Sequence, residues 1–204
     1  MVVTTDEPEQ ETSEQPARVS RRERKRDQQA ELRRLSALRQ VRQYPDAVLR
    51  QPATPVTEFS DDLRNVVARM LRLMQDADGV GLAGNQVGLL RRLFVYRPAG
   101  EGDGVALINP AIVERSDETD SGSEGCLSLQ GVDVHVERST RIVVEASDAH
   151  GEAITIAAEG FDARILQHEI DHLDGVLIFD RAPAAERTQA LATLRPEPGP
   201  RGRE

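Results

Sequence analysis

Cysteine and long apolar runs are scarce in this chain of 204 residues. The single cysteine, Cys126, excludes an internal disulfide and is typical of a reducing compartment. No apolar run approaches the roughly 18 residues that a membrane helix needs, and the acidic segment 1–15 lacks the apolar centre of a secretory signal. We therefore expect a cytoplasmic protein that has no membrane partner.

Lysine is also nearly absent, since Lys25 is the only lysine among 26 basic residues. Charge is unevenly placed along the chain. Residues 1–16 carry five acids and no base, residues 17–42 carry ten bases and three acids (+7), and residues 43–204 carry 16 bases and 27 acids (−11). A short basic segment therefore precedes an acidic body, for which we expect no DNA partner.

Composition divides the chain into four parts. Residues 1–20 are polar and have few apolar side chains to bury, so we expect a disordered acidic tail. Residues 21–43 form a basic segment rich in good helix formers. We expect one folded domain over residues 44–182, and a C-terminal tail over residues 183–204 with a short helix followed by disorder. A thin apolar stripe at a spacing of three supports the basic helix: Leu32, Leu35, Leu38 and Val41.

The folded part shows a helical pattern, then strand patterns, then a second helical pattern. Ser60 to Gln75 has apolar residues at helical spacing, and residues 161–173 form a second helix that Gly175 ends. We expect an α+β fold with mostly antiparallel strands around the central helix 161–173 and an N-terminal helix packed on the sheet. The strands are expected from β-branched runs at residues 92–97, 104–110, 111–115, 132–136, 140–146 and 153–158.

The central helix carries the first chemical signal, HEIDH at residues 168–172. Residues four apart lie on one face of a helix, so His168 and His172 can point at one metal ion. Glu169 is rotated by about 100° from His168 and can lean over the same ion. A solvated helix face with two ordinary histidines is the alternative, so a further ligand has to decide.

A catalytic metal site usually has three protein ligands and one open position for water. One metalloprotease pattern would place a third histidine where this chain has Ile178, which cannot be a ligand. Another protease class uses a downstream glutamate, but Glu186 lies in a short polar tail. Cys126 lies in a loop with glycines, and its thiolate is a strong ligand for zinc or ferrous iron. A buried, inert cysteine is the alternative interpretation.

Three stretches resemble the motifs of the peptide deformylase family, and they occur in the family's order. Residues 79–86 read GVGLAGNQ, residues 124–128 read EGCLS, and residues 167–172 read QHEIDH. The resemblance runs from about Tyr44 to Arg181. It implies a catalytic domain that removes the N-formyl group from the formyl-methionine of nascent proteins and releases formate.

The resemblance also implies a cofactor. Cys126, His168 and His172 would bind one divalent metal, with water in the fourth position. The family natively uses Fe²⁺, and Zn²⁺, Ni²⁺ or Co²⁺ can stand in its place, because nitrogen and sulfur donors bind all of these ions. Glu169 is implied as the general acid–base that moves the proton of the attacking water.

Further roles follow from the same resemblance. The side-chain amide of Gln86 and the backbone N–H of Leu127 would stabilise the oxyanion that forms during attack on the formyl carbon. Glu124 and Arg138 match a charged pair that we interpret as holding the motif loop. The positions implied to bind the formyl-methionyl peptide are Val80, Gly81, Gly125 and Ile165.

Two other functions stay open at this point. A zincin-type metallopeptidase would cut internal peptide bonds, although the missing third histidine and Cys126 argue against it. A non-catalytic, ribosome-associated deformylase homologue would have no use for Gln86, Cys126 and Glu169, so their presence argues against it. The basic segment 17–42 also has two interpretations: an arm that contacts ribosomal RNA, where the substrate emerges, or a helix that leans on the acidic body.

Overall fold

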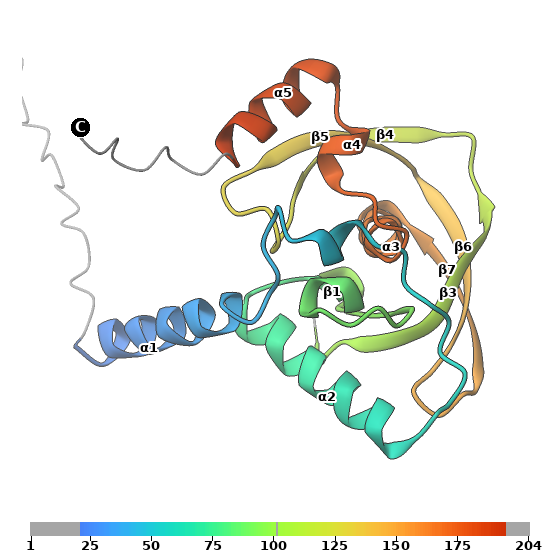
Figure 1. Ribbon diagram of the computed structural model, residues 1–204, viewed down its shortest axis with the longest axis horizontal. Coiled ribbons are helices and arrows are strands. Elements are labelled where there is room, and N and C mark those ends of the chain that lie inside the picture. The colour runs from blue at the N-terminus through green and yellow to red at the C-terminus, as the bar shows by residue number, and fades with distance from the viewer. Residues whose placement is uncertain (1–20, 101, 195–204) are drawn as a thin grey trace, which may run out of the picture.

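The computed structural model describes residues 21–100 and 102–194. Two antiparallel sheets surround a central helix, α3 (Gly160–Leu173), which Figure 1 shows end-on. The expected α+β class and its central helix are therefore confirmed. The disorder expected for residues 1–20 and 195–204 falls outside the described residues.

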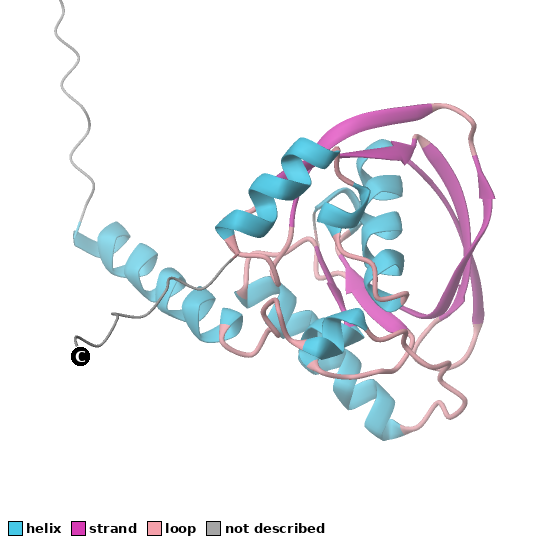
Figure 2. Ribbon diagram, turned by 45° about the horizontal axis from the view of Figure 1, so that its top comes forward, coloured by secondary structure: helices cyan, strands magenta, loops and turns pink. Residues whose placement is uncertain are grey.

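The main sheet has five strands in the order β1-β2-β3-β6-β7, and a second sheet pairs β4 with β5. Every neighbouring pair is antiparallel, and the strands curve around one side of α3 in Figure 2. The strands are β1 (Gly81–Ala83), β2 (Leu93–Tyr96), β3 (Val105–Arg115), β4 (Thr119–Gly125), β5 (Asp133–Ser139), β6 (Arg141–Ser147) and β7 (Ala153–Glu159).

Two details of the strand prediction are wrong. The runs 104–110 and 111–115 form one strand, β3, whose register with β6 shifts between Ile108 and Ala111. Pro110 is tolerated inside this strand because it lies at that irregularity, where Asn109 has a positive φ of 53° and its side chain bonds both backbone groups of Val56. The strands β1 and β4 were not predicted at all.

The strand β4 shows why the sequence pattern missed it. Its sequence, TDSGSEG, contains no apolar residue, so no alternation marks it as a strand. It pairs along its whole length with β5, whose Val134 and Val136 supply the buried apolar face. Pairing with the neighbouring strand, rather than local propensity, therefore fixes this segment.

Helix α2 (Asp61–Asp76) packs against β1, β2 and β3. Asp61 and Asp62 lie in its first turn, where they favour the positive end of the helix dipole. Its buried face has apolar residues three and four apart, as the sequence predicts: Leu63, Val67, Met70, Leu73 and Met74. Both methionines are core residues.

Helix α1 (Arg21–Leu38) projects from the body and meets it only near its C-terminal end (Figure 1). The expected apolar stripe is buried only in part, because Leu32 and Leu35 are exposed. Ala37 and Val41 are buried and Leu38 is partly buried, in the cluster that α2 also enters. None of the described helices is both long enough and apolar enough to cross a membrane.

The remaining short elements place loops around the centre. They are the 3₁₀ helices η1 (Ala47–Arg50), η2 (Gly84–Val87) and η3 (Pro98–Gly100), and the helices α4 (Ile178–Arg181) and α5 (Ala184–Thr193). Helices α4 and α5 pack against β5. They therefore cover β5 of the second sheet.

We expect Leu63→Ala to lower the free energy of unfolding by about 2–5 kcal/mol, because it leaves a cavity in a closed core. Leu63 has no exposed surface. The matched control is Leu32→Ala, at a position 62 % exposed on α1, where we expect a change within about 0.5 kcal/mol. Urea unfolding of the two variants measures both, and similar losses would contradict the assignment of α2 to the core.

Candidate metal centre and active site

Helix α3 supplies several polar side chains to the interior. Its apolar face, with Leu166 and Ile170, packs into the core, and this packing holds the other face against the second sheet. His168 and His172 lie one turn apart on that face, with ring centroids 4.9 Å apart. A pair of histidines that the sequence places on one helix face is thus held inside the protein rather than in solvent.

Cys126 joins the two histidines from the loop that follows β4. Its Sγ lies 3.2 Å from Nε2 of His172, and one donor atom from each of the three residues lies within 4.8 Å of the others. One thiol and two imidazoles are donors that suit zinc or ferrous iron. The structure therefore brings together the three residues that the sequence singled out.

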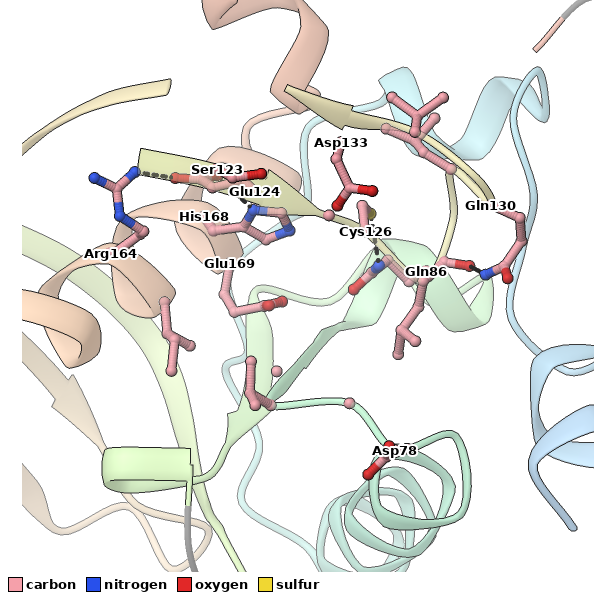
Figure 3. Close-up of a pocket in the computed structure, with 18 of the residues that line it drawn as sticks. Asp78, Gln86, Ser123, Glu124, Cys126, Gln130, Asp133, Arg164, His168 and Glu169 are labelled. Carbon is pink, nitrogen blue, oxygen red and sulfur yellow. Dashed lines mark hydrogen bonds and ion pairs between the residues drawn. The ribbon is translucent and has the colours of Figure 1, made fainter. Parts of the chain in front are cut away.

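A buried carboxylate orients one of these groups. Glu124 lies at the end of β4, and its Oε2 is 2.9 Å from Nδ1 of His168, an interaction drawn in Figure 3. A histidine that ligates a metal through one ring nitrogen is usually held by a carboxylate at the other. This contact turns Nε2 of His168 toward Cys126.

Two arginines also hold the same carboxylate. Arg138 donates from Nε and Nη2 to Glu124, both at 2.9 Å, and Arg164 donates from Nη1 at 2.9 Å. Burial acts to raise the pKa of Glu124, but the hydrogen bonds from Arg138 and His168 outweigh it, and the pKa lies well below its ordinary value. Glu124 is therefore a stable anion beneath the histidine.

The charge network extends to a second carboxylate that the sequence argument missed. Asp171 accepts hydrogen bonds from Arg138 and from Arg181, whose Nη2 lies 2.6 Å from Oδ1. Asp171 lies within the HEIDH stretch, and Arg164 lies four residues before His168 on the same helix. Helical spacing from the histidines was the signal that could have found both.

The pKa values of the two histidines are shifted in opposite directions. Burial lowers the pKa of His172 well below its ordinary value, which keeps the ring neutral as a ligand must be. For His168, burial also acts to lower the pKa, but hydrogen bonds to Cys126 and Glu124 raise it well above the ordinary value. Groups that draw a proton onto one ring equally attract a cation, so the donor set fits a divalent metal.

Glu169 follows His168 on α3 and has almost no exposed surface. Burial raises its pKa to about 7, with His168 acting in the opposite direction. Its Oε2 has no hydrogen-bond partner among the described residues. A buried carboxylate with one unengaged oxygen and a pKa near neutrality suits proton transfer.

Glycine at position 81 makes room for this carboxylate. A Cβ atom at Gly81 would come within 2.2 Å of Oε1 of Glu169 and within 2.9 Å of its Cγ. The space next to the backbone of β1 is therefore already filled by the glutamate.

Gln86 lies in η2 with a fixed amide orientation. Its Oε1 accepts a 2.8 Å hydrogen bond from the backbone N–H of Ala83, so its amide nitrogen faces the other way. That nitrogen lies 3.5 Å from Sγ of Cys126 and 3.2 Å from Oγ of Ser128. The amide donor is therefore aimed at the metal centre.

One cleft of about 360 Å³ joins these groups. Figure 3 shows His168 and Glu169 from α3 facing Cys126 and Gln86 across it. His172 is buried behind this surface. The other nine residues selected from the sequence all line the cleft: Val80, Gly81, Gln86, Gly125, Cys126, Leu127, Ile165, His168 and Glu169.

A Cys–His–His donor set beside a buried glutamate, in an antiparallel α+β fold, defines the class of metal-dependent hydrolases. A family model described as polypeptide deformylase matches residues 38–188. The chain belongs to the polypeptide deformylase family, as its three motifs indicated.

Individual relatives agree with this assignment. The peptide deformylase of Thermotoga sp. strain RQ2 is 48% identical over 147 residues, 72% of this chain and 88% of the relative. That of Acidothermus cellulolyticus is 42% identical over 161 residues, 78% of this chain and 87% of the relative. The family match begins at residue 38, so it excludes nearly all of α1 and includes every residue that lines the cleft except Arg34.

Solved structures share the fold. Peptide deformylase 1B of Arabidopsis thaliana superposes with a TM-score of 0.73 at 39% identity, over 76% of this chain and 87% of that chain. The Thermotoga maritima peptide deformylase superposes with a TM-score of 0.68 at 47% identity, over 70% of this chain and 96% of that chain.

We expect Cys126→Ala, His168→Ala and His172→Ala each to lose the metal, because two protein ligands hold a catalytic ion poorly. Elemental analysis of the purified variants measures the metal content per chain. The matched control is His135→Ala, which removes an exposed histidine that pairs with Glu186 and lies outside the Cys126, His168 and His172 set. This variant should keep its full metal content. Full occupancy in Cys126→Ala would remove the cysteine from the site.

Proposed function

We propose that this chain removes the formyl group from the N-terminal formyl-methionine of nascent peptides and releases formate. The observation that carries the proposal is one cleft that gathers a Cys–His–His donor set, Glu169 and Gln86 in a member of the deformylase family. Amide hydrolysis needs an activated water, a group that moves its proton, and donors for the oxyanion. The cleft offers residues for each of these needs.

Cys126, His168 and His172 are the proposed ligands of one divalent metal, which we propose is natively Fe²⁺. Zn²⁺, Ni²⁺ and Co²⁺ fit the same donors, because nitrogen and sulfur ligands bind all four ions. The bound ion would supply a Lewis acid that makes water a competent nucleophile near neutral pH. Glu124 holds His168 in the orientation that this role requires.

Glu169 is the proposed general acid–base. Its unengaged Oε2 accepts a proton from the attacking water and returns it to the methionine nitrogen as the formyl group leaves. Its depth in the cleft keeps this oxygen away from bulk solvent. A carboxyl whose pKa burial raises to about 7 can both accept and donate a proton near neutral pH.

Gln86 and the backbone N–H of Leu127 are the proposed oxyanion donors. The bond from Ala83 N–H to Oε1 of Gln86 fixes the amide before substrate arrives. Donors that are already oriented need no reorganisation as charge develops.

The proposed peptide site lies between β1 and β4. Both are edge strands, and Gly81 and Gly125 bring their backbones to the cleft. A peptide bound in an extended form can pair with such an edge through its own backbone groups. Val80 and Ile165 supply the apolar wall for the methionine side chain.

Internal peptide cleavage by a zincin-type site is not favoured. Ile178 occupies the position where a third histidine would stand, and Glu186 is engaged elsewhere, because it accepts a 2.6 Å hydrogen bond from the backbone N–H of His135. Cys126 completes the donor set instead. Retention of Glu169 and Gln86 in the cleft likewise disfavours a non-catalytic homologue.

We expect Glu169→Gln to keep its metal and to lose turnover by about 10²–10⁴-fold, the usual contribution of a positioned acid–base. The assay is formate release from a short formyl-methionyl peptide, with elemental analysis on the same sample. Glu145→Gln, at an exposed position on β6, is the matched control and should leave turnover unchanged. Near wild-type turnover in Glu169→Gln would end the general-base assignment.

We also propose that the basic helix α1, within segment 17–42, contacts ribosomal RNA. Most of α1 is exposed and projects from the body. Among the described residues, no ion pair joins the basic residues of α1 to the acidic body; Arg34 pairs with Glu31 of the same helix. These observations favour the arm over a helix that leans on its own body.

We expect deletion of residues 1–30 to abolish co-sedimentation with ribosomes, because residues 21–30 carry five bases and two acids. Binding of the full chain should fall steeply with salt, as phosphate contacts do. Deletion of residues 1–20 is the matched control and should leave binding intact. Turnover on a short formyl-methionyl peptide should be unchanged in both truncated proteins. Equal co-sedimentation of the two truncated proteins with ribosomes would exclude the RNA contact.

A further inference from the structure

The last turns of α1 bring one arginine to the active-site cleft. Arg34 and Ala37 lie three residues apart on one face of α1, and Ala37 is buried against the body, as is Val41 just beyond the end of the helix. Leu38 packs on the same apolar cluster as Leu127, the residue after the proposed cysteine ligand. This packing anchors the end of α1 beside the cleft, where Arg34 is part of the lining.

Arg34 differs from the other arginine of the cleft in its contacts. Arg164 is engaged by Glu124, by the carbonyl of Val136 and by Asp120, so its guanidinium serves the framework. Arg34 is 42% exposed along its side chain and has a longer 3.4 Å contact with Glu31, which is itself 54% exposed. Its guanidinium is therefore less committed to the framework than that of Arg164 and can meet a charged group that enters the cleft.

Two aspartates add negative charge to the lining of the cleft. Asp78 and Asp133 also line it, and among the described residues neither forms an ion pair with Arg34. A substrate with an acidic side chain would meet repulsion from these two carboxylates. Arg34 is the lining cation placed to offset that repulsion.

We propose that Arg34 is a specificity-determining residue that favours an acidic side chain directly after the formyl-methionine. This inference rests on the proposed function. The formyl group has to reach the metal donors at the floor of the cleft, so the next residues of the peptide leave toward the partly exposed mouth. Since Arg34 precedes the family match at residue 38, helix α1 adds this preference to a site that the family shares.

The test uses the full metal-loaded chain and three peptides that differ at one position: formyl-Met-Glu-Ser-amide, formyl-Met-Gln-Ser-amide and formyl-Met-Lys-Ser-amide. The amide removes the C-terminal carboxylate, which would otherwise compete for the arginine. We expect Arg34→Gln to lower kcat/KM for the Glu peptide by about two- to five-fold, the size of an exposed ion pair, and to leave the Gln peptide unchanged. The Lys peptide should improve or stay the same.

Three further measurements distinguish a direct contact between Arg34 and the acidic side chain from a general electrostatic effect of the basic helix. The loss should appear in KM with kcat unchanged, because the contact exists equally in the ground and transition states. Arg34→Lys should keep most of the preference, and high salt should reduce the preference in the wild type. Arg33→Gln is the matched control, since Arg33 is exposed on the same helix but does not line the cleft.

The outcomes are distinct. The inference is overturned if kcat/KM for the Glu peptide, relative to the Gln peptide, is unchanged in Arg34→Gln or falls equally in Arg33→Gln. In either case, deformylation of the Gln peptide still supports the proposed function. Absence of formate release from all three peptides by the wild-type chain would overturn the proposed function and this inference with it.

Discussion

The buried carboxylate of Glu124 is the interaction on which the site depends. A buried charge is costly unless it is paired and hydrogen-bonded, and here both oxygens are engaged by Arg138 of β5, with Arg164 and His168 of α3 completing the set. One anion therefore ties β4, β5 and α3 together at the point where the cysteine loop begins. Removing it would leave two largely buried arginines without their partner, which is why the position of the metal donors and the stability of this part of the fold are linked.

The fourteen residues of α3 both pack into the core and position side chains of the site. Apolar packing on the main sheet holds the helix in the centre, but packing alone tolerates small rotations. Hydrogen bonds between specific atoms do not tolerate such rotations, because they weaken steeply with misalignment. The bonds from Arg138 and Arg181 to Asp171, together with the contact between Glu124 and His168, fix the rotation of the helix about its axis. The apolar face sets the depth of the helix, and the polar face sets the direction of its ligands.

Local pattern was sufficient for much of this arrangement. Helical spacing predicted the histidine pair and the buried face of α2. Three short motifs predicted the family and nine residues that line one cleft, with His172 buried behind it. The parts that failed depend on contacts distant in sequence. Strand β4 has no apolar residue and exists because β5 pairs with it. The irregularity in β3 depends on the side chain of Asn109 bonding Val56. The place of Arg34 depends on how α1 docks, which no repeat or spacing in the sequence specifies.

The lack of a side chain at Gly81 determines what a substitution at this position would displace. Positions 81 and 169 come from different motifs, yet they compete for one volume, since Oε1 of Glu169 occupies the place of a Cβ at residue 81. A larger residue there would meet a side chain rather than backbone, so the chain could still fold while its carboxylate moved aside. Substitution at this position would therefore displace the carboxylate of Glu169 in a chain that still folds, a change that a screen for folding alone would not detect.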